Sequence, residues 1–193
     1  MATRLSVIAT RTGDQGTTGL GDGSRVDKDA PRIAAMGDVD ELNTVIGMLR
    51  AQIRQEAEQS PQAWHGHIDA LLARIQHHLF DLGAELCIPG HTALNAEHVA
   101  FLDAALAGHN AALTPLKEFI LPGGTQAASL AHLARTVCRR AERSVVTLNR
   151  SEPLNEPPLQ YLNRLSDLCF VLARVLNKNA GESDVLWENP PRG

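Results

Sequence analysis

Three arginines repeat at four-residue intervals within the stretch 134–143. On a helix, Arg135, Arg139 and Arg143 lie one turn apart, so their guanidinium groups share one stripe. The nearby Glu142 is a single negative charge and cannot neutralise three cations. An oligophosphate is therefore a natural partner, because guanidinium groups bind phosphate oxygens strongly. Taken alone, such a stripe is more often a basic helix face that only contacts solvent.

A second candidate site is the Gly- and Thr-rich segment 10–23. Its glycines let backbone N–H groups approach a ligand, its threonines add hydroxyl donors, and Arg11 adds positive charge. The segment lacks the Gly-Lys-Ser/Thr of a Walker A loop, and Ser24 stands where a GxGxxG pattern needs its last glycine. Composition alone is more typical of a linker or a group of turns. Its combination with the arginine stripe favours a phosphate-binding loop.

The composition is that of one domain without a basic surface. The chain has 193 residues, 44% of them hydrophobic, which suffices for one sizeable core. A net charge of −4 and a pI near 6.0 argue against a nucleic-acid-binding protein. No apolar run is long enough to cross a membrane, and residues 1–6 show no signal-peptide core. The widely spaced Cys87, Cys138 and Cys169 are predicted to be reduced, as in a cytoplasmic protein.

Helical periodicity and the lack of a convincing strand predict an all-α, five-helix bundle. The expected helices are 31–54, 61–88, 96–110, 125–150 and a last one after Pro158. Ser60 is the expected N-cap of the second helix, with Pro61 at its first position, and Asn95 is the expected N-cap of the third. Residues 115–124 are expected to form a loop despite their apolar content.

Two other kinds of site have weaker support. Bundles often hold di-iron sites through Glu-x-x-His pairs, but no glutamate here has a histidine three residues later. His77 and Asp81 lie one turn apart and could bind a metal ion, although a solvated pair is the simpler interpretation. No protein metal site is predicted, and no Ser/His/Asp or Cys/His pattern is evident from spacing. A reaction that needs no protein nucleophile fits better, with catalysis by positioning and electrostatics.

Five motifs in this order resemble the PduO-type ATP:cob(I)alamin adenosyltransferases. They are Thr10-Arg11-Thr12-Gly13-Asp14-Gln15-Gly16-Thr17-Thr18, Gly37-Asp38-Val39-Asp40-Glu41-Leu42-Asn43, Phe119-Ile120-Leu121-Pro122-Gly123-Gly124, the arginine stripe, and Tyr161-Leu162-Asn163-Arg164-Leu165-Ser166-Asp167. The resemblance covers about the whole chain, as far as Asp184-Val185-Leu186-Trp187. Arg11 stands where lysine is common, and Gln15 occupies a variable position; neither departure disturbs the assignment.

The resemblance implies that the 5′-deoxyadenosyl group of ATP, expected with Mg²⁺, is transferred to the cobalt of cobalamin and that triphosphate is released. The reduced cobalt is itself the nucleophile, which accounts for the missing triad. The implied architecture is one domain, 1–193, with a nucleotide-binding loop segment 1–30, a helical bundle 31–180 and a tail 181–193. The implied assembly is a homotrimer with active sites between subunits. A reductase and an adenosylcobalamin-dependent enzyme are the implied partners.

The resemblance also implies roles for individual residues. The implied ATP-binding residues are Thr10, Arg11, Thr12, Gly13, Thr18, Gly19 and Lys28 in the N-terminal loop, and Arg139, Arg140, Ala141, Glu142, Arg143 and Asn163 in the last two helices. Phe119 is implied at the corrin, where it displaces the lower axial ligand of cobalt and so eases reduction of cob(II)alamin. Asp40 and Arg135 resemble an intersubunit ion pair beside the corrin. These three residues and Arg139 form the implied catalytic set.

Each implied role has a structural alternative. Phe119 could be a packing residue, Asp40 could lie on an exposed helix face, and Asn163 could simply bond to Asp167. Lys28 rests wholly on the resemblance. Two function classes therefore remain: an adenosyltransferase, and a non-catalytic nucleotide-binding bundle that serves as a sensor or cofactor carrier. Phe119 favours the enzyme, because an ATP sensor does not need an aromatic side chain at a corrin.

Overall fold

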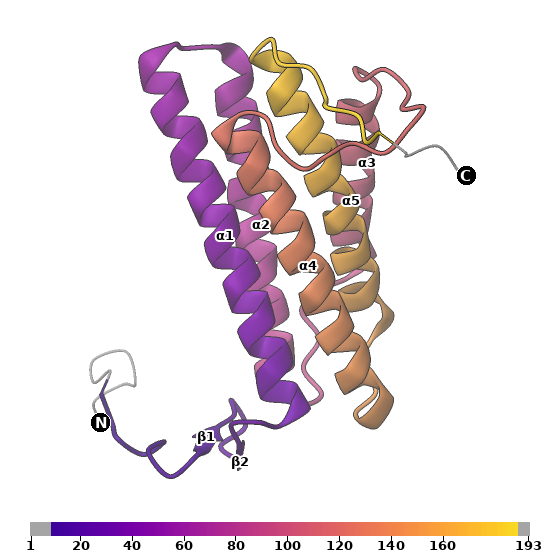
Figure 1. Ribbon diagram of the computed structural model, residues 1–193. Coiled ribbons are helices and arrows are strands. Elements are labelled where there is room, and N and C mark those ends of the chain that lie inside the picture. The colour runs from indigo at the N-terminus through magenta and orange to yellow at the C-terminus, as the bar shows by residue number, and fades with distance from the viewer. Residues whose placement is uncertain (1–8, 189–193) are drawn as a thin grey trace.

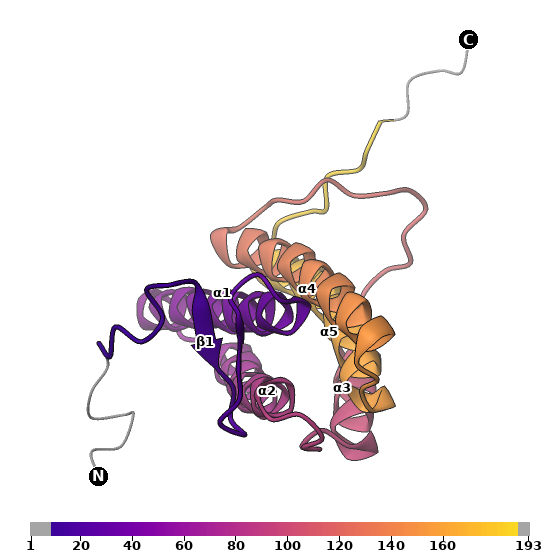
Figure 2. The same ribbon diagram turned by 90° about the horizontal axis from the view of Figure 1, so that it is seen from below.

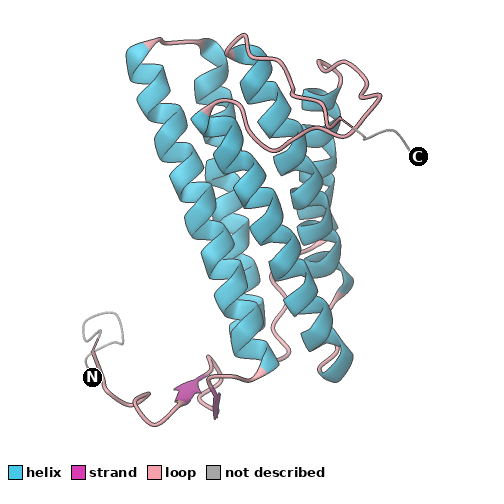
Figure 3. Cartoon of the chain, viewed as in Figure 1, coloured by secondary structure: helices cyan, strands magenta, loops and turns pink. Residues whose placement is uncertain are grey.

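The computed structural model describes residues 9–188; the predicted absence of a signal-peptide core in residues 1–6 lies outside them. These residues form a helical bundle with a small hairpin before it (Figures 1 and 3). The elements are β1 Thr17–Gly19, β2 Arg25–Asp27, α1 Pro31–Gln59, α2 Ala63–Cys87, α3 Ala96–Asn110, α4 Gln126–Ser151 and α5 Glu156–Asn179. The predicted all-α class is confirmed. The antiparallel pair β1–β2, inside the predicted N-terminal loop, is a departure from the prediction of no strand.

Hydrogen bonds at the helix ends show which residues determine where each helix begins or stops. Asn95 caps α3 by accepting a hydrogen bond from the Glu97 amide at 3.0 Å, and Thr125 caps α4 through its hydroxyl oxygen. The predicted start of α2 is wrong. The Ser60 amide donates a hydrogen bond to the Glu56 carbonyl at 2.9 Å and so completes the last turn of α1. Ser60 is therefore the C-cap of α1, and Pro61 after it cannot continue the helix.

The core lies between closely packed helices. Helix α4 packs against α1 and α5, α1 packs against α2, and α3 packs against α5 (Figure 2). The buried side of α4 consists largely of small residues without exposed surface: Ala127, Ala128, Ala131, Ala134 and Ala141. Small residues at a contact let helix axes approach, and they leave the arginines of α4 on its outer side. Within residues 9–188, no helix is both long and apolar enough to cross a membrane.

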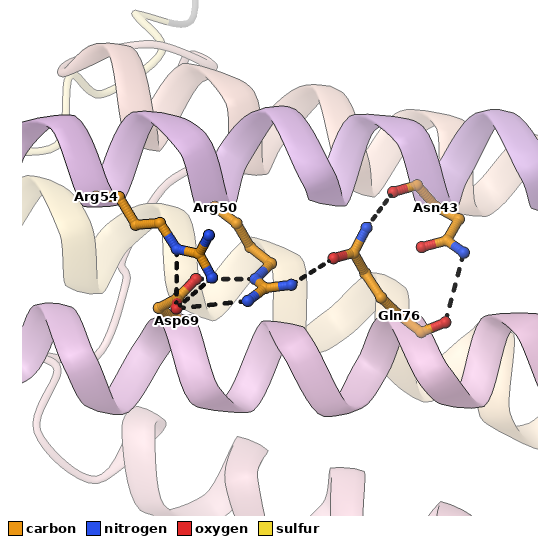
Figure 4. Close-up of polar contacts among 5 residues, drawn as sticks. All are labelled: Asn43, Arg50, Arg54, Asp69 and Gln76. Atoms are coloured by element: carbon orange, nitrogen blue, oxygen red, sulfur yellow. Dashed lines mark hydrogen bonds and ion pairs between the residues drawn. The ribbon is translucent and has the colours of Figure 1, made fainter.

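A polar network fixes the register of α1 against α2 (Figure 4). Arg50 binds Asp69 at 2.8 Å and Gln76 at 2.7 Å, and Arg54 binds the same carboxylate at 3.0 Å. The Gln76 side-chain amide donates to the Asn43 carbonyl at 3.0 Å. Burial raises the pKa of Asp69, but the hydrogen bonds from both arginines outweigh it, so the net shift is downward. The charged pair is therefore retained at neutral pH.

The two long irregular segments lie at opposite ends of the bundle (Figure 1). The hairpin joins the end where α1 begins, through the Gly21 amide on the Cys87 carbonyl at 2.8 Å. A Cβ at Gly21 would lie 2.5 Å from Ile88 Cγ1, so this close approach requires glycine. The loop 111–125 and the tail after α5 cover the other end. The predicted binding segments are thus separated by the length of the helices.

Candidate functional site

The arginine stripe lies on the outer side of α4, as predicted. Arg139 and Arg143 are exposed, Arg135 is half-buried, and none of the three forms an ion pair with another described residue. Arg143 donates only to the Arg139 carbonyl, at 3.1 Å. The Arg135 Nε is buried without a hydrogen-bond partner among the described residues. The stripe therefore presents positive charge and unused donors to a ligand.

The five-residue run 139–143 does not act as one surface. Arg140 points to α1, where it binds Asp38 at 3.1 Å and also Glu41, and the hydrogen bond that it donates to Glu41 raises the pKa of Arg140. Ala141 is fully buried in the core. The implied ATP contacts of these two side chains therefore find no support in their orientation. The position of each residue around the helix, about 100° per residue, decides which face it reaches.

The remaining α4 and α5 residues of the implied ATP site lie together. The Asn163 side-chain amide donates to Glu142 Oε1 at 3.1 Å, so Glu142 is held by α5 and not by Arg139. Arg139 and Asp167 line the same hollow between α4 and α5. The alternative pairing of Asn163 with Asp167 is not among the hydrogen bonds of the described residues.

Phe119 lies on the same side of the bundle as the hollow between α4 and α5. Phe119 is 75% exposed, so it lies outside the core of this chain, and its ring lies edge-on to Trp187 with centroids 6.3 Å apart. Phe119, Arg135 and Phe170 line a pocket of about 490 Å³. Arg135 and Phe170 also line the hollow that contains Arg139, so the two cavities are neighbours, and together they are called the α4–α5 groove. Phe119 lines one cavity of this groove, Arg139 lines the other, and Arg135 lines both.

His132 contributes a neutral imidazole to the pocket beside Phe119. Burial lowers the pKa of His132, and the positive charge of Arg135 lowers it further. The ring packs near Phe170 with centroids 6.1 Å apart. This part of the groove therefore combines aromatic and apolar side chains with the charged rim residues Lys117, Glu118 and Arg135, and its aromatic part suits a flat, apolar ligand face.

In the N-terminal segment, the implied loop residues gather around Lys28. A Cβ built on Gly13 would lie 3.2 Å from Lys28 Nζ, so the ammonium group lies beside the loop backbone. The Thr10 and Thr12 hydroxyls are 3.0 Å apart, and Arg11 adopts a positive φ of 58°. Thr18 and Gly19 belong to β1. The segment thus presents hydroxyl, amide and cationic donors together.

Sequence reasoning missed Arg25, which holds this segment in shape. Its guanidinium donates to the Thr12 carbonyl at 2.7 Å and to the Thr17 hydroxyl at 2.6 Å. Arg25 pairs with Gly19 across the hairpin, which points its side chain back to the loop. Recognition of the turn between β1 and β2 is the signal that could have found it.

One chain does not bring all implied residues together. Asp40 is exposed and lines a groove of about 510 Å³ between α1 and α2, with Met36 and Phe80, whereas Arg135 faces the groove of α4 and α5. Residues 9–16 extend away from the bundle on the side of α1 and α2 (Figures 1 and 2). No hydrogen bond or ion pair of the described residues joins segment 9–28 to α4 or α5. The implied site residues therefore form two groups, two candidate half-sites, on different faces of the chain.

The buried thiols are not nucleophiles. Burial raises the pKa of Cys138 well above its ordinary value and that of Cys169 to about 12, so both stay protonated at neutral pH. Within residues 9–188, no three His, Cys, Asp or Glu side chains are grouped closely enough to hold a metal ion. The charged groove offers binding and positioning, not a covalent intermediate on the protein.

Known proteins that are similar to this chain in sequence and fold are cobalamin or corrinoid adenosyltransferases. The family model described as Cobalamin adenosyltransferase matches residues 8–176. A Cobalamin adenosyltransferase of Cupriavidus metallidurans is 61% identical over 188 residues, 97% of each chain, and a Corrinoid adenosyltransferase of Bacillus subtilis is 46% identical over 94% of this chain and 92% of its own. A variant PduO-type ATP:corrinoid adenosyltransferase from Lactobacillus reuteri, complexed with cobalamin and ATP, has a TM-score of 0.85 at 35% identity, covering 94% of this chain and 99% of that one. The chain belongs to the cobalamin adenosyltransferase family.

Proposed function

We propose that the protein transfers the 5′-deoxyadenosyl group of ATP to the cobalt of cob(I)alamin, giving adenosylcobalamin and triphosphate. The observation that carries this proposal is the pair of neighbouring cavities, one lined by Phe119 and the other by Arg139, with Arg135 lining both. It combines an aromatic surface for a corrin with unneutralised cations for an oligophosphate. Family membership supports both ligands, because a Lactobacillus reuteri relative is complexed with cobalamin and ATP.

In this reaction the protein itself forms no covalent bond to the substrates, because cobalt is the nucleophile. Cobalt(I) supplies the electron pair that forms the new bond to C5′ of ATP, and the C5′–O bond breaks, with its electron pair leaving on triphosphate. Negative charge grows on the leaving triphosphate, so arginines aimed at it stabilise the transition state more than the ground state. Arg139 and Arg143 have no competing carboxylate partner within the described chain and suit this role.

Phe119 is proposed to act on the lower face of the corrin. An aromatic ring beneath cobalt leaves no room for water or the nucleotide tail as a lower ligand. Four-coordinate cob(II)alamin is easier to reduce, so the nucleophile forms more readily. The high exposure of Phe119 beside a pocket supports this role, since most of the residue is open to a ligand.

The complete site is proposed to form between subunits of a homotrimer. The N-terminal loop with Lys28 would bind the ATP whose phosphates lie on a neighbour's arginine stripe. Asp40 of one subunit would pair with Arg135 of the next. The placement of the two half-sites on different faces of one chain supports this arrangement.

Mg²⁺ is expected to enter with ATP. It commonly keeps several waters and is held largely by phosphate oxygens, a pattern that needs no cage of side chains. We place the protein in the cytoplasm, where its three free cysteines would stay reduced. A reductase and an adenosylcobalamin-dependent enzyme are the proposed partners before and after the reaction.

A direct test mixes the protein with ATP, Mg²⁺ and chemically reduced cobalamin. The expected result is the absorption spectrum of adenosylcobalamin together with one triphosphate per product. Omission of ATP is the control. Binding of ATP and cobalamin without either product would instead identify the non-catalytic carrier.

A further inference from the structure

The loop that carries Phe119 is fastened to α5 at both of its ends. Arg174 donates to the Thr114 carbonyl at 2.9 Å, where the loop begins. At the other end, the Asn177 side chain donates to the Gly123 carbonyl at 3.1 Å and accepts from the Thr125 amide at 3.0 Å. Arg174 and Asn177 are 6% and 4% exposed. Two buried side chains of α5 therefore fix where the loop leaves and returns.

The middle of the same loop is held by the tail after α5. The Leu121 amide donates to the Val185 carbonyl at 2.8 Å, and the Trp187 amide donates to the Phe119 carbonyl at 2.7 Å. These bonds flank an antiparallel bridge between Ile120 and residue 186. The position of the Phe119 backbone thus depends directly on where the tail lies.

Besides these backbone hydrogen bonds, the tail is held by a charge and not by burial. Val185, Leu186 and Trp187 are 60%, 51% and 41% exposed, so packing contributes little to holding them. Asp184, directly before them, binds Arg174 Nε at 2.7 Å, and its side chain is 18% exposed. One guanidinium therefore holds both the start of the Phe119 loop and the tail that pairs with its middle.

We propose that the Arg174–Asp184 ion pair is a positioning device for Phe119, which sets the ring at the height that keeps cobalt free of a lower ligand. This inference rests on the proposed role of Phe119. Loss of the Asp184 charge leaves a buried guanidinium unpaired and releases the tail. The Phe119 ring then moves, whereas Arg139 and Arg143, which do not line the Phe119 pocket, are unaffected.

The test compares Asp184→Asn with Glu152→Gln in the full-length protein. Glu152 pairs at 2.6 Å with Arg32, a guanidinium of equal burial that also binds a backbone carbonyl, but at the opposite end of the bundle. The readouts are turnover with cob(II)alamin and a reductant, the KM for ATP, the melting temperature, and the spectrum of four-coordinate cob(II)alamin in the ATP-bound protein. Asp184→Asn is expected to lower turnover about ten- to a hundredfold, as misplacement of a catalytic group does. The four-coordinate signal should shrink, with the KM for ATP unchanged.

Glu152→Gln is expected to lower the melting temperature by a similar amount and to keep the four-coordinate signal. If Asp184→Asn does not fold, Arg174→Lys replaces it. A lysine keeps the charge but cannot hold both Asp184 and the Thr114 carbonyl in the same geometry, so the signal should again shrink.

Two further variants separate this inference from the proposed function. If the ion pair acts through Phe119, the double variant Phe119→Ala with Asp184→Asn should be no slower than Phe119→Ala alone. Losses that multiply, or an Asp184→Asn protein with a normal four-coordinate signal, would overturn the positioning role. Wild-type turnover in Phe119→Ala would instead overturn the proposed role of Phe119 itself.

Discussion

The two ends of the bundle hold their binding segments in different ways. The N-terminal segment, residues 9–28, joins the bundle through the Gly21 amide and the buried Leu20, and is shaped internally by Arg25. The Phe119 loop is tied at its start, middle and end to α5 and to the tail. One end is a self-contained hairpin, and the other is a loop locked to the bundle.

This difference matches what each end is proposed to do. Triphosphate offers many oxygens to several donors, so a binding segment tolerates small shifts. Exclusion of a lower cobalt ligand depends on one ring at one height, so small shifts have large effects. Changes at the hairpin should therefore raise the KM for ATP, and changes at the Phe119 loop should lower turnover with ATP affinity unchanged.

Phe119→Ala should have the largest effect. Turnover from cob(II)alamin is expected to fall about a hundredfold or more, because a fifth ligand returns to cobalt, while ATP affinity stays nearly unchanged. Chemically reduced cob(I)alamin should rescue much of the rate. Leu121→Ala, an exposed neighbour whose backbone bond to the tail is kept, is the control. Loss of ATP binding in Phe119→Ala would place the ring elsewhere.

Arg139→Ala should have the second-largest effect, and it should weaken ATP use, which Phe119→Ala leaves nearly unchanged. Loss of one charge-assisted contact to phosphate is expected to weaken ATP use by about ten- to a hundredfold, or about 1.5–3 kcal/mol. Arg150→Ala, an exposed arginine at the end of the same helix, should be nearly silent. Steady-state kinetics with varied ATP measures both. Equal, small effects would make the stripe a solvated face.

Asp40→Ala and Arg135→Ala test whether the two faces meet between subunits. Each single change should lower activity, and the double variant should lose less than the sum, with a coupling energy of about 1–3 kcal/mol. Activity assays on the four proteins of the cycle give that coupling. Strict additivity would show that the two side chains do not interact.

Arg25→Ala should have the smallest effect. Its hydrogen bonds to Thr12 and Thr17 only shape the loop, so the KM for ATP should rise about three- to tenfold with little change in kcat. Arg54→Ala, an exposed arginine on α1 whose partner Asp69 is also held by Arg50, is the control. A fall in kcat without a change in KM would mean that the hairpin acts on the reaction step.

Local signals predicted the helices, and contacts distant in sequence escaped prediction. Asn95 and Thr125 mark helix starts because each cap bonds within its own turn. The prediction for Ser60 was wrong because a residue between two helices can be the C-cap of the first or the N-cap of the second. The arginine stripe follows from four-residue spacing, whereas the clamp of Arg174 on Thr114 spans sixty residues and has no local pattern.

The central claim is that the hairpin end of one subunit completes the arginine stripe of another. Its most direct test co-expresses two inactive proteins, one carrying Arg11→Ala with Lys28→Ala and the other carrying Arg139→Ala with Arg143→Ala. In randomly mixed trimers with sites between subunits, about a quarter of the sites combine an intact loop with an intact stripe, so about a quarter of wild-type activity should return. Activity no higher than that of either variant alone, in trimers shown to be mixed, would contradict the claim and place the whole site within one chain.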